Sequence, residues 1–221
     1  MGAKFPDMPQ GGPMTVVLFD VDGVLIDSWA AYRTVWGAWA ATHALDADTV
    51  WTAIHGRRPE ETVRDVAAHL DPTVERLVLD RLVVGAEPQF RAFAGAADLL
   101  DGLPVGRWAV VTSGSGSATR ERFLRNGLPL PDVLVGGEDV DAGKPDPECF
   151  LRAARRLQVA PRAALVVEDS PAGVAAARAA TMRVLAVAAT HRAEELAAAD
   201  VVVPDLPAAA ELVHRWLAAR Q

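Results

Sequence analysis

Short apolar runs, each followed by a stretch with helical spacing, limit this chain to a few folds. The first run is TVVLFD at positions 15–20. Similar runs recur at 107–112, 133–135, 163–167, 183–187 and 200–203. The stretches with helical spacing lie at 118–126, 147–158, 172–180, 191–199 and 207–220. Continuous apolar runs of this length are typical of strands buried on both faces of a parallel sheet. The alternation therefore predicts an α/β fold with a Rossmann-like parallel sheet and helices on both of its faces.

Residues 28–93 break this alternation. We find no convincing strand in them, and the sequence predicts helices at 28–44, 48–54, 59–70 and 72–92. Pro59 and Pro72 stand where a first-turn proline is tolerated, and Asp71 can cap the last of these helices. An all-helical insertion after the first strand predicts a small lid at the carboxyl edge of the sheet. The expected organisation is a flexible leader at 1–13, a core domain at 14–27 and 94–221, and a helical cap domain at 28–93.

Composition excludes several classes of function. The chain has 221 residues, 51% of them hydrophobic, with a formal net charge of −7 and one cysteine. A nucleic-acid partner is not expected, because binding a phosphate backbone needs a basic face. One cysteine cannot form an internal disulfide, and no run of 18 apolar residues is present to span a membrane. We expect a cytoplasmic protein that acts on a small molecule as a monomer, with a dimer left open.

Two aspartates follow the first predicted strand directly, in the sequence Asp20-Val-Asp22-Gly23. Sites in parallel sheets gather at the carboxyl ends of strands, so both carboxylates can project toward one metal ion or one phosphoryl group. Gly23 permits the sharp turn that must follow. A loop with Asx-turns and a solvated charge pair is an equally good interpretation of these residues alone.

The second major strand ends in the sequence Thr112-Ser113-Gly114-Ser115. A hydroxyl group and free backbone N–H groups at a helix N-terminus form an anion-binding site. An ordinary helix N-cap would use the same residues. The two glycines at 114 and 116 match part of a dinucleotide-binding fingerprint, but its third glycine is missing, so we discount that interpretation.

Lysine use in this chain is unusual. Its 22 basic residues are 20 arginines and two lysines, and Lys4 lies in the expected leader. The other lysine, Lys144, stands in the stiff turn Gly-Lys-Pro-Asp-Pro before a predicted helix. A compact ammonium group suits a point contact with a phosphoryl oxygen and a carboxylate better than a planar guanidinium does. We therefore favour a functional Lys144 over a lysine in an ordinary surface turn.

Two adjacent acids, Glu168 and Asp169, end a further predicted strand. Oxygen ligands from two strand ends, without a cluster of His or Cys, suit Mg²⁺ better than Zn²⁺. Helix capping by Asp169 or Ser170 is the alternative. All four motifs end or follow strands of one sheet, so their side chains can converge. Such convergence is hard to explain by four independent structural roles.

In chain order, the segments DVDGV, VVTSG, GKPDP and VVEDSPAG resemble the four motifs of the haloacid dehalogenase superfamily of phosphatases. The resemblance extends from the first predicted strand to the last predicted helices. The insertion at 28–93 is similar to the helical cap of that superfamily. Within it, the chain resembles the sugar- and polyol-phosphate phosphatases and the β-phosphoglucomutase-like enzymes.

The resemblance implies a Mg²⁺-dependent phosphatase. Asp20 would be the nucleophile that forms an aspartyl-phosphate, and Asp22 would act first as general acid and then as general base. Lys144 would neutralise charge between Asp20 and the phosphoryl group. The metal would be held by Asp20, by the backbone carbonyl of Asp22 and by Asp169, with Glu168 as a further ligand.

The same resemblance implies how the substrate is held. Thr112 would hold the equatorial phosphoryl oxygens, and the connection at 55–60 resembles the substrate-specificity loop of the sugar- and polyol-phosphate phosphatases. The residues implied in substrate binding are Ser113, Gly114, His55, Arg57 and Arg58. Solvated arginines on a helix turn are the structural alternative. Tyr32 is expected to pack between cap and core, and the helically spaced Trp29, Trp36 and Trp39 to form the interior of the cap.

Related chemistries have different signatures. Hydrolytic dehalogenation needs no metal and normally lacks the second aspartate, which is present here as Asp22. Phosphonate cleavage uses a Schiff-base lysine from the cap, and residues 28–93 contain no lysine. β-Phosphoglucomutase-like mutases typically carry a cap lysine, and a histidine where Tyr32 stands, so a phosphatase is favoured and a mutase stays open. A phospho-acceptor signalling domain is the alternative outside enzymes, and Asp22 and the helical lid disfavour it.

Overall fold

A six-stranded parallel sheet forms the centre of the computed structural model, which describes residues 14–218. In spatial order its strands are β5 (Leu134–Val135), β4 (Trp108–Val111), β1 (Val16–Phe19), β6 (Ala164–Glu168), β7 (Arg183–Val187) and β8 (Val201–Val203). Each neighbouring pair is parallel. Every residue of β1, β4 and β6 is buried, as the continuous apolar runs predict.

Helices cover both faces of this sheet. One face carries α5 (Ala96–Asp101), α6 (Gly116–Arg125) and α9 (Leu206–Ala218). The other face carries α7 (Glu148–Arg156) and α8 (Pro171–Ala179). Because successive side chains of a strand point to opposite faces, Val17 and Phe19 of β1 enter the first apolar core and Val16 and Leu18 enter the second. The predicted α/β fold class is confirmed.

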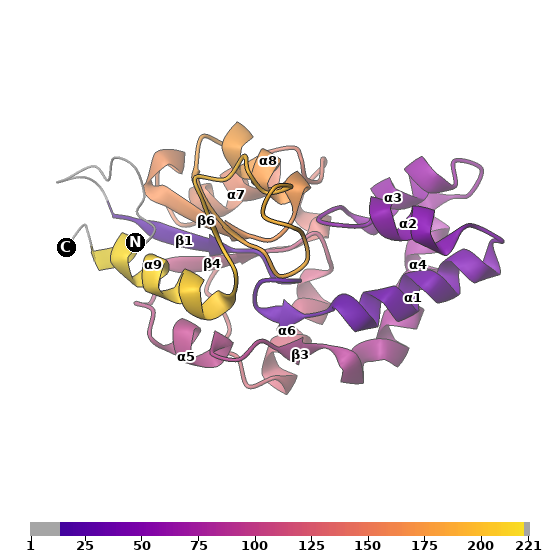
Figure 1. Cartoon of the computed structure of the whole chain (residues 1–221), viewed down its shortest axis with the longest axis horizontal. Coiled ribbons are helices and arrows are strands. Elements are labelled where there is room, and N and C mark those ends of the chain that lie inside the picture. Colours follow the sequence, from indigo (N-terminus) through magenta and orange to yellow (C-terminus); the bar gives the residue numbers. More distant parts are fainter. Residues whose placement is uncertain (1–13, 219–221) are drawn as a thin grey trace.

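The inserted helices lie beyond the carboxyl ends of the strands (Figure 1). They are α1 (Trp29–Thr42), α2 (Ala47–Ala53), α3 (Pro59–Val66) and α4 (Pro72–Ala86), followed by the 3₁₀ turn η1 (Glu87–Gln89). Asp46 and Asp71 cap α2 and α4 by accepting hydrogen bonds from the backbone N–H groups of Thr49 and Thr73. We refer to these helices as the cap.

The last cap helix is shorter than the sequence predicts, and a strand follows it. Helix α4 ends at Ala86 rather than at residue 92, because Pro88 in the 3₁₀ turn has no N–H group to continue the helix. Strand β3 (Arg91–Ala92) then pairs antiparallel with β2 (Ile26–Asp27). The expectation of no strand within 28–93 is therefore wrong at its end, where this two-stranded ribbon joins cap and core.

Two further local predictions differ from the structure. The sequence predicts a helix over 191–199, but residues 193–198 form consecutive turns. Hydrogen bonds such as that from Leu196 N–H to the Ala193 carbonyl oxygen there span three residues rather than four. The six-residue helix α5 was not expected from the sequence. In the described part of the chain, no helix is long and apolar enough to cross a membrane. The expected leader at 1–13 lies outside the described residues.

Candidate active site

Three adjacent strands bring predicted site residues to one place. Strand β1 lies between β4 and β6 in the sheet. Asp20 directly follows β1, Thr112 directly follows β4, and Glu168 ends β6. Because these strands run in the same direction, their carboxyl ends meet at one edge, and the cap lies beyond that edge (Figure 1). Gly23 has a φ of 82° and approaches the Asp169 carboxylate so closely that a side chain at Gly23 would strike it.

The side chain of Lys144 lies between Asp20 and Glu168 at this edge of the sheet. Its Nζ is 2.5 Å from Oδ1 of Asp20 and 2.6 Å from Oε1 of Glu168, and only 1% of the residue is exposed. Burial alone would lower the pKa of Lys144, but the two carboxylates raise it above its usual range, so the ammonium stays charged. The other oxygen of Glu168 accepts from Ser170 Oγ and from the backbone N–H groups of Asp169 and Ser170. Both oxygens of Glu168 therefore have partners.

Three buried carboxylates crowd together beside this one ammonium. Asp20, Glu168 and Asp169 offer oxygen atoms that all lie within 4.8 Å of one another. Burial, together with the charge of Glu168, raises the pKa of Asp20 to about 7 despite the nearby Lys144. Burial and the neighbouring acids raise the pKa of Asp169 well above its usual range. If all three carboxylates were ionised they would carry more negative charge than Lys144 balances, and this repulsion adds to burial in raising the two pKa values. Their hard oxygen donors are those that suit Mg²⁺.

Asp22 points toward the cap side of the site. Its Oδ2 accepts a hydrogen bond of 3.2 Å from the Tyr32 hydroxyl on α1, and NH1 of the buried Arg122 on α6 lies 3.8 Å from its Oδ1. Burial raises the pKa of Asp22, and the charge of Arg122 opposes that shift. The sequence assigned Tyr32 to packing and gave no signal for Arg122, because a contact between an early loop and a later helix has no local pattern.

The segment after β4 binds both to itself and to the cap. The Thr112 hydroxyl accepts from the Gly114 N–H at 3.0 Å. The Ser113 hydroxyl donates to the carbonyl oxygen of Gly56 at 2.8 Å, which ties the cap connection at 55–60 to the core. All three predicted residues of this segment line the cavity described next.

A cavity of about 690 Å³, part of it open to solvent, lies between cap and core. The core contributes acids and hydroxyl groups, among them Asp20, Asp22, Asp169 and Thr112. The cap contributes mostly rings, namely those of Trp29, Tyr32, Trp36, Trp51 and His55. Trp36 and Trp39 are buried in the apolar core as expected, although Trp36 also lines the cavity. Trp29 differs from the expectation, because it lines the cavity and stays 41% exposed.

Two of the three cap residues expected to bind substrate line this cavity. His55 stacks on Trp29 with a centroid distance of 5.4 Å, and burial and the nearby His191 lower the pKa of His55 to about 4. Arg57 also lines the cavity and pairs with Asp65 at 2.5 Å.

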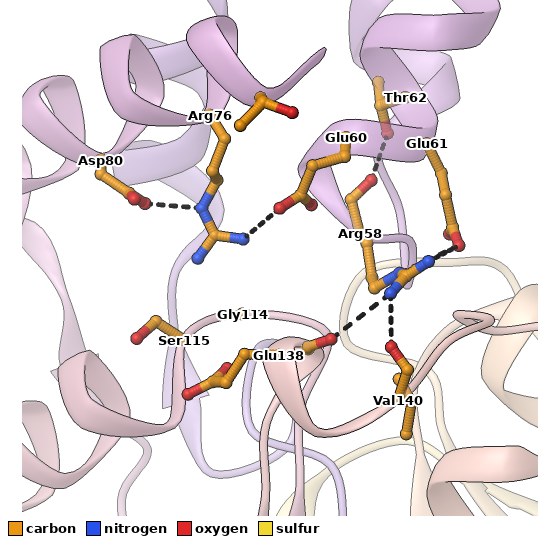
Figure 2. A network of polar contacts seen from close by, with 12 residues as sticks. Arg58, Glu60, Glu61, Thr62, Arg76, Asp80, Gly114, Ser115, Glu138 and Val140 are labelled. Carbon is orange, nitrogen blue, oxygen red and sulfur yellow. Dashed lines mark hydrogen bonds and ion pairs between the residues drawn. The ribbon is translucent and has the colours of Figure 1, made fainter.

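Arg58, the third of these residues, is directed elsewhere. All three of its nitrogens donate, to Glu61 of the cap and to backbone carbonyl oxygens of residues 137–141 in the core (Figure 2). Its donors are used within the protein, and Arg58 is not among the residues that line the cavity. The sequence could not distinguish Arg57 from Arg58, because they are adjacent residues of the same type in one turn. They differ only in the direction in which their side chains point, which the sequence does not show.

The fold and the site define a hydrolase with a Rossmann-like core and a helical cap. The chain belongs to the haloacid dehalogenase-like hydrolase family, whose model matches residues 14–181. Hexitol phosphatase A of Escherichia coli (strain K12) is 38% identical over 197 residues, which cover 86% of this chain and 90% of that protein. Validoxylamine A 7'-phosphate phosphatase of Streptomyces hygroscopicus subsp. limoneus is 38% identical over 202 residues, covering 86% and 93%. Among solved structures, CbbY from Rhodobacter sphaeroides in complex with phosphate has a TM-score of 0.73 and 25% identity, covering 88% of this chain and 95% of that one.

Proposed function

We propose that this chain hydrolyses a small phosphorylated sugar or polyol through an aspartyl-phosphate intermediate, with Mg²⁺ as cofactor. The chain is a phosphoric monoester hydrolase, and its similarity to a hexitol phosphatase supports the choice of substrate class. The observation that carries the mechanism is the buried contact of Lys144 with Asp20 and Glu168 beside the cavity. A cation held against a carboxylate at the foot of a cavity can neutralise a phosphoryl group that the carboxylate attacks.

In this mechanism Asp20 and Asp22 divide the chemistry. A carboxylate oxygen of Asp20 attacks phosphorus, the bond from phosphorus to the leaving oxygen breaks, and Asp22 gives that oxygen its proton. Asp22 then takes a proton from water as the water oxygen attacks phosphorus and the bond to Asp20 breaks. Inorganic phosphate leaves, and both aspartates return to their starting states. The raised pKa of Asp22 favours the protonated form that a general acid needs.

The acidic cluster supports a resident Mg²⁺. Asp20 and Asp169 would hold it with the backbone carbonyl of Asp22, and a divalent cation there would stabilise the ionised form of carboxyl groups whose pKa values burial and neighbouring acids raise. When bound, the ion would add positive charge at the phosphoryl oxygens. Glu168 contributes by holding Lys144, since both of its oxygens already accept hydrogen bonds.

The cap side of the cavity would bind the part of the substrate that carries no phosphate. Trp29, Trp36 and Trp51 offer ring surface for C–H groups, and Arg57 and His55 offer hydrogen bonds to hydroxyl groups. The low pKa of His55 keeps its imidazole neutral at pH 7, so that it can both donate and accept. Arg58 has no part in this contact.

A phosphate-release assay tests the proposal. Sugar, polyol and nucleoside monophosphates are compared with Mg²⁺, in EDTA, and after Mg²⁺ is restored. We expect the highest kcat/KM among sugar or polyol phosphates, loss of turnover in EDTA and recovery with Mg²⁺. An isomerised sugar phosphate with little free phosphate would indicate a mutase instead. No turnover of any substrate, with a stable acyl-phosphate formed from acetyl phosphate, would indicate a signalling domain.

A further inference from the structure

Two cap residues hold the core segment that leads into Lys144. Arg58 and Glu61 lie at the start of α3 and reach across to residues 137–143. Figure 2 shows the part of this contact that Arg58 makes with Val140. The Arg58 guanidinium donates to three carbonyl oxygens of that segment, those of Gly137 (3.4 Å), Val140 (2.8 Å) and Asp141 (2.7 Å). Backbone carbonyl groups that have no partner in regular secondary structure need other donors, and one cap side chain supplies donors to three carbonyl groups of this segment.

Glu61 completes the contact from the same turn of the cap. Its Oε1 accepts from the Gly143 N–H at 2.8 Å and from Nε and NH2 of Arg58 at 2.9 and 2.7 Å. Gly143 directly precedes Lys144, and a Cβ atom there would lie 2.5 Å from Oε2 of Glu61 and 2.9 Å from Cγ of Arg58. The cap therefore packs on the backbone one residue away from the lysine.

A second shielded arginine of the cap, Arg76, makes no such contact with the core among the contacts described. Arg76 on α4 is as shielded as Arg58, with 16% and 15% of their side chains exposed. Arg76 pairs with Glu60 at 3.1 Å and with Asp80 at 2.8 Å, both within the cap (Figure 2). Arginines of this cap thus find carboxylate partners without the core, whereas Arg58 gives three of its hydrogen bonds to core carbonyls.

We propose that Arg58 and Glu61 are positioning residues that set the place of Lys144 through residues 137–143. The contact of Lys144 with Asp20 then depends on the cap being docked on the core. The cap, which is proposed to select the substrate, would thereby also place the positive charge of Lys144 at the phosphoryl site. This proposal rests on the proposed phosphatase function. Displacing a catalytic group by about 1 Å can cost about 10²-fold in rate, which makes such support from outside the site measurable.

A double-mutant cycle tests whether Arg58 acts through Lys144. We expect Arg58→Met to lower kcat by about tenfold to a hundredfold with KM changed less than about twofold, since the lysine is misplaced while the cavity walls stay. In the Lys144→Ala background the same change should lower kcat less than about twofold. Arg76→Met is the matched control and should leave kcat within about twofold in the wild-type background. If the losses in kcat from Arg58→Met and Lys144→Ala multiply in the double variant, the two residues act independently and the proposal is overturned. A loss in kcat from Arg76→Met equal to that from Arg58→Met would also overturn it.

Two further measurements keep the proposal testable if Arg58→Met folds poorly. Gly143→Ala inserts a methyl group into the same contact and should lower kcat in the same way, with Gly85→Ala, whose added Cβ meets nothing within 4 Å, as its control. Hydrogen exchange of the peptide spanning 137–146 should quicken in Arg58→Met and Gly143→Ala but not in either control. Unchanged exchange would overturn the proposal whether or not the chain releases phosphate. If exchange quickens in these variants but the wild-type chain releases no phosphate from any substrate, the proposed function is refuted, and the positioning role for catalysis is refuted with it.

Discussion

The two walls of the cavity have opposite chemistry. The core wall consists of carboxylates and hydroxyl groups at strand ends, with Lys144 buried behind them. The cap wall consists mainly of rings carried on helices, with Trp29 partly exposed and His55 neutral. Charge held rigidly at strand ends suits one reaction on any phosphate ester, whereas ring surface suits the choice among esters. The difference predicts that core-wall variants lose kcat and that cap-wall variants change KM.

The largest effect is expected from Asp20→Asn. The amide keeps the shape of the side chain but is no nucleophile, so kcat should fall at least about 10³-fold. The circular dichroism spectrum should stay unchanged, because strand β1 and its buried neighbours are untouched. Initial rates of phosphate release with Mg²⁺ measure the loss. Turnover within tenfold of the wild-type value would remove Asp20 from the proposed mechanism and, with it, the division of labour between the walls.

A smaller loss is expected from Lys144→Arg. The change keeps the positive charge but replaces a compact ammonium by a larger planar group, at a site with 1% exposure and oxygen partners at 2.5 and 2.6 Å. We expect kcat to fall about 10²-fold, a loss typical of removing one well-placed donor to the reacting group. The assay is again phosphate release, with protein stability followed by thermal unfolding. An unchanged kcat would mean that the single lysine outside residues 1–13 stands there by chance.

The core wall was largely predictable from sequence, and the cap wall was not. Asp20, Thr112 and Glu168 each stand at a strand end, so a local pattern identifies them and the parallel sheet brings them together. Contacts of the cap depend on how helices pack over distances that no local pattern encodes. The bond from Tyr32 to Asp22 and the contacts of Arg58 with residues 137–141 arise in that way. The sequence therefore indicated the type of reaction better than it indicated which residues select the substrate.

Trp29→Leu examines the cap wall directly. Losing ring surface from the cavity should raise KM for a sugar phosphate about threefold to tenfold, with kcat within about twofold, a size typical of one aromatic contact. Acetyl phosphate, which has no sugar part, should be hydrolysed at an unchanged rate. Trp39→Phe is the control, because Trp39 is buried and its indole donates to Glu75 at 2.8 Å. That variant should lower the melting temperature and leave KM unchanged, whereas equal KM effects from both variants would contradict a substrate contact at Trp29.

The smallest expected effect concerns the pH dependence of stability at His55. Its pKa is about 4 in the folded chain, below the ordinary value of 6.5, because burial and His191 disfavour the charged ring. Between those two pH values the unfolded chain binds more protons at this group than the folded chain does. The contribution of His55 to the free energy of unfolding should therefore be complete above pH 6.5 and decline as the pH falls toward 4.

Comparing the wild-type chain with His55→Gln isolates this contribution from the other acidic and basic groups that titrate in the same range. We expect the melting temperature of the wild-type chain, relative to the variant, to be about 2–4 °C lower at pH 5 than at pH 7.5. This corresponds to about 1 kcal/mol, a figure reduced from the full shift because the ring is partly exposed to solvent. Thermal unfolding at both pH values measures the difference. If the difference in melting temperature between the two chains is the same at both pH values, His55 has an ordinary pKa in the folded chain. The cap wall of the cavity would then be hydrated at His55, which contradicts a closed wall that selects the substrate.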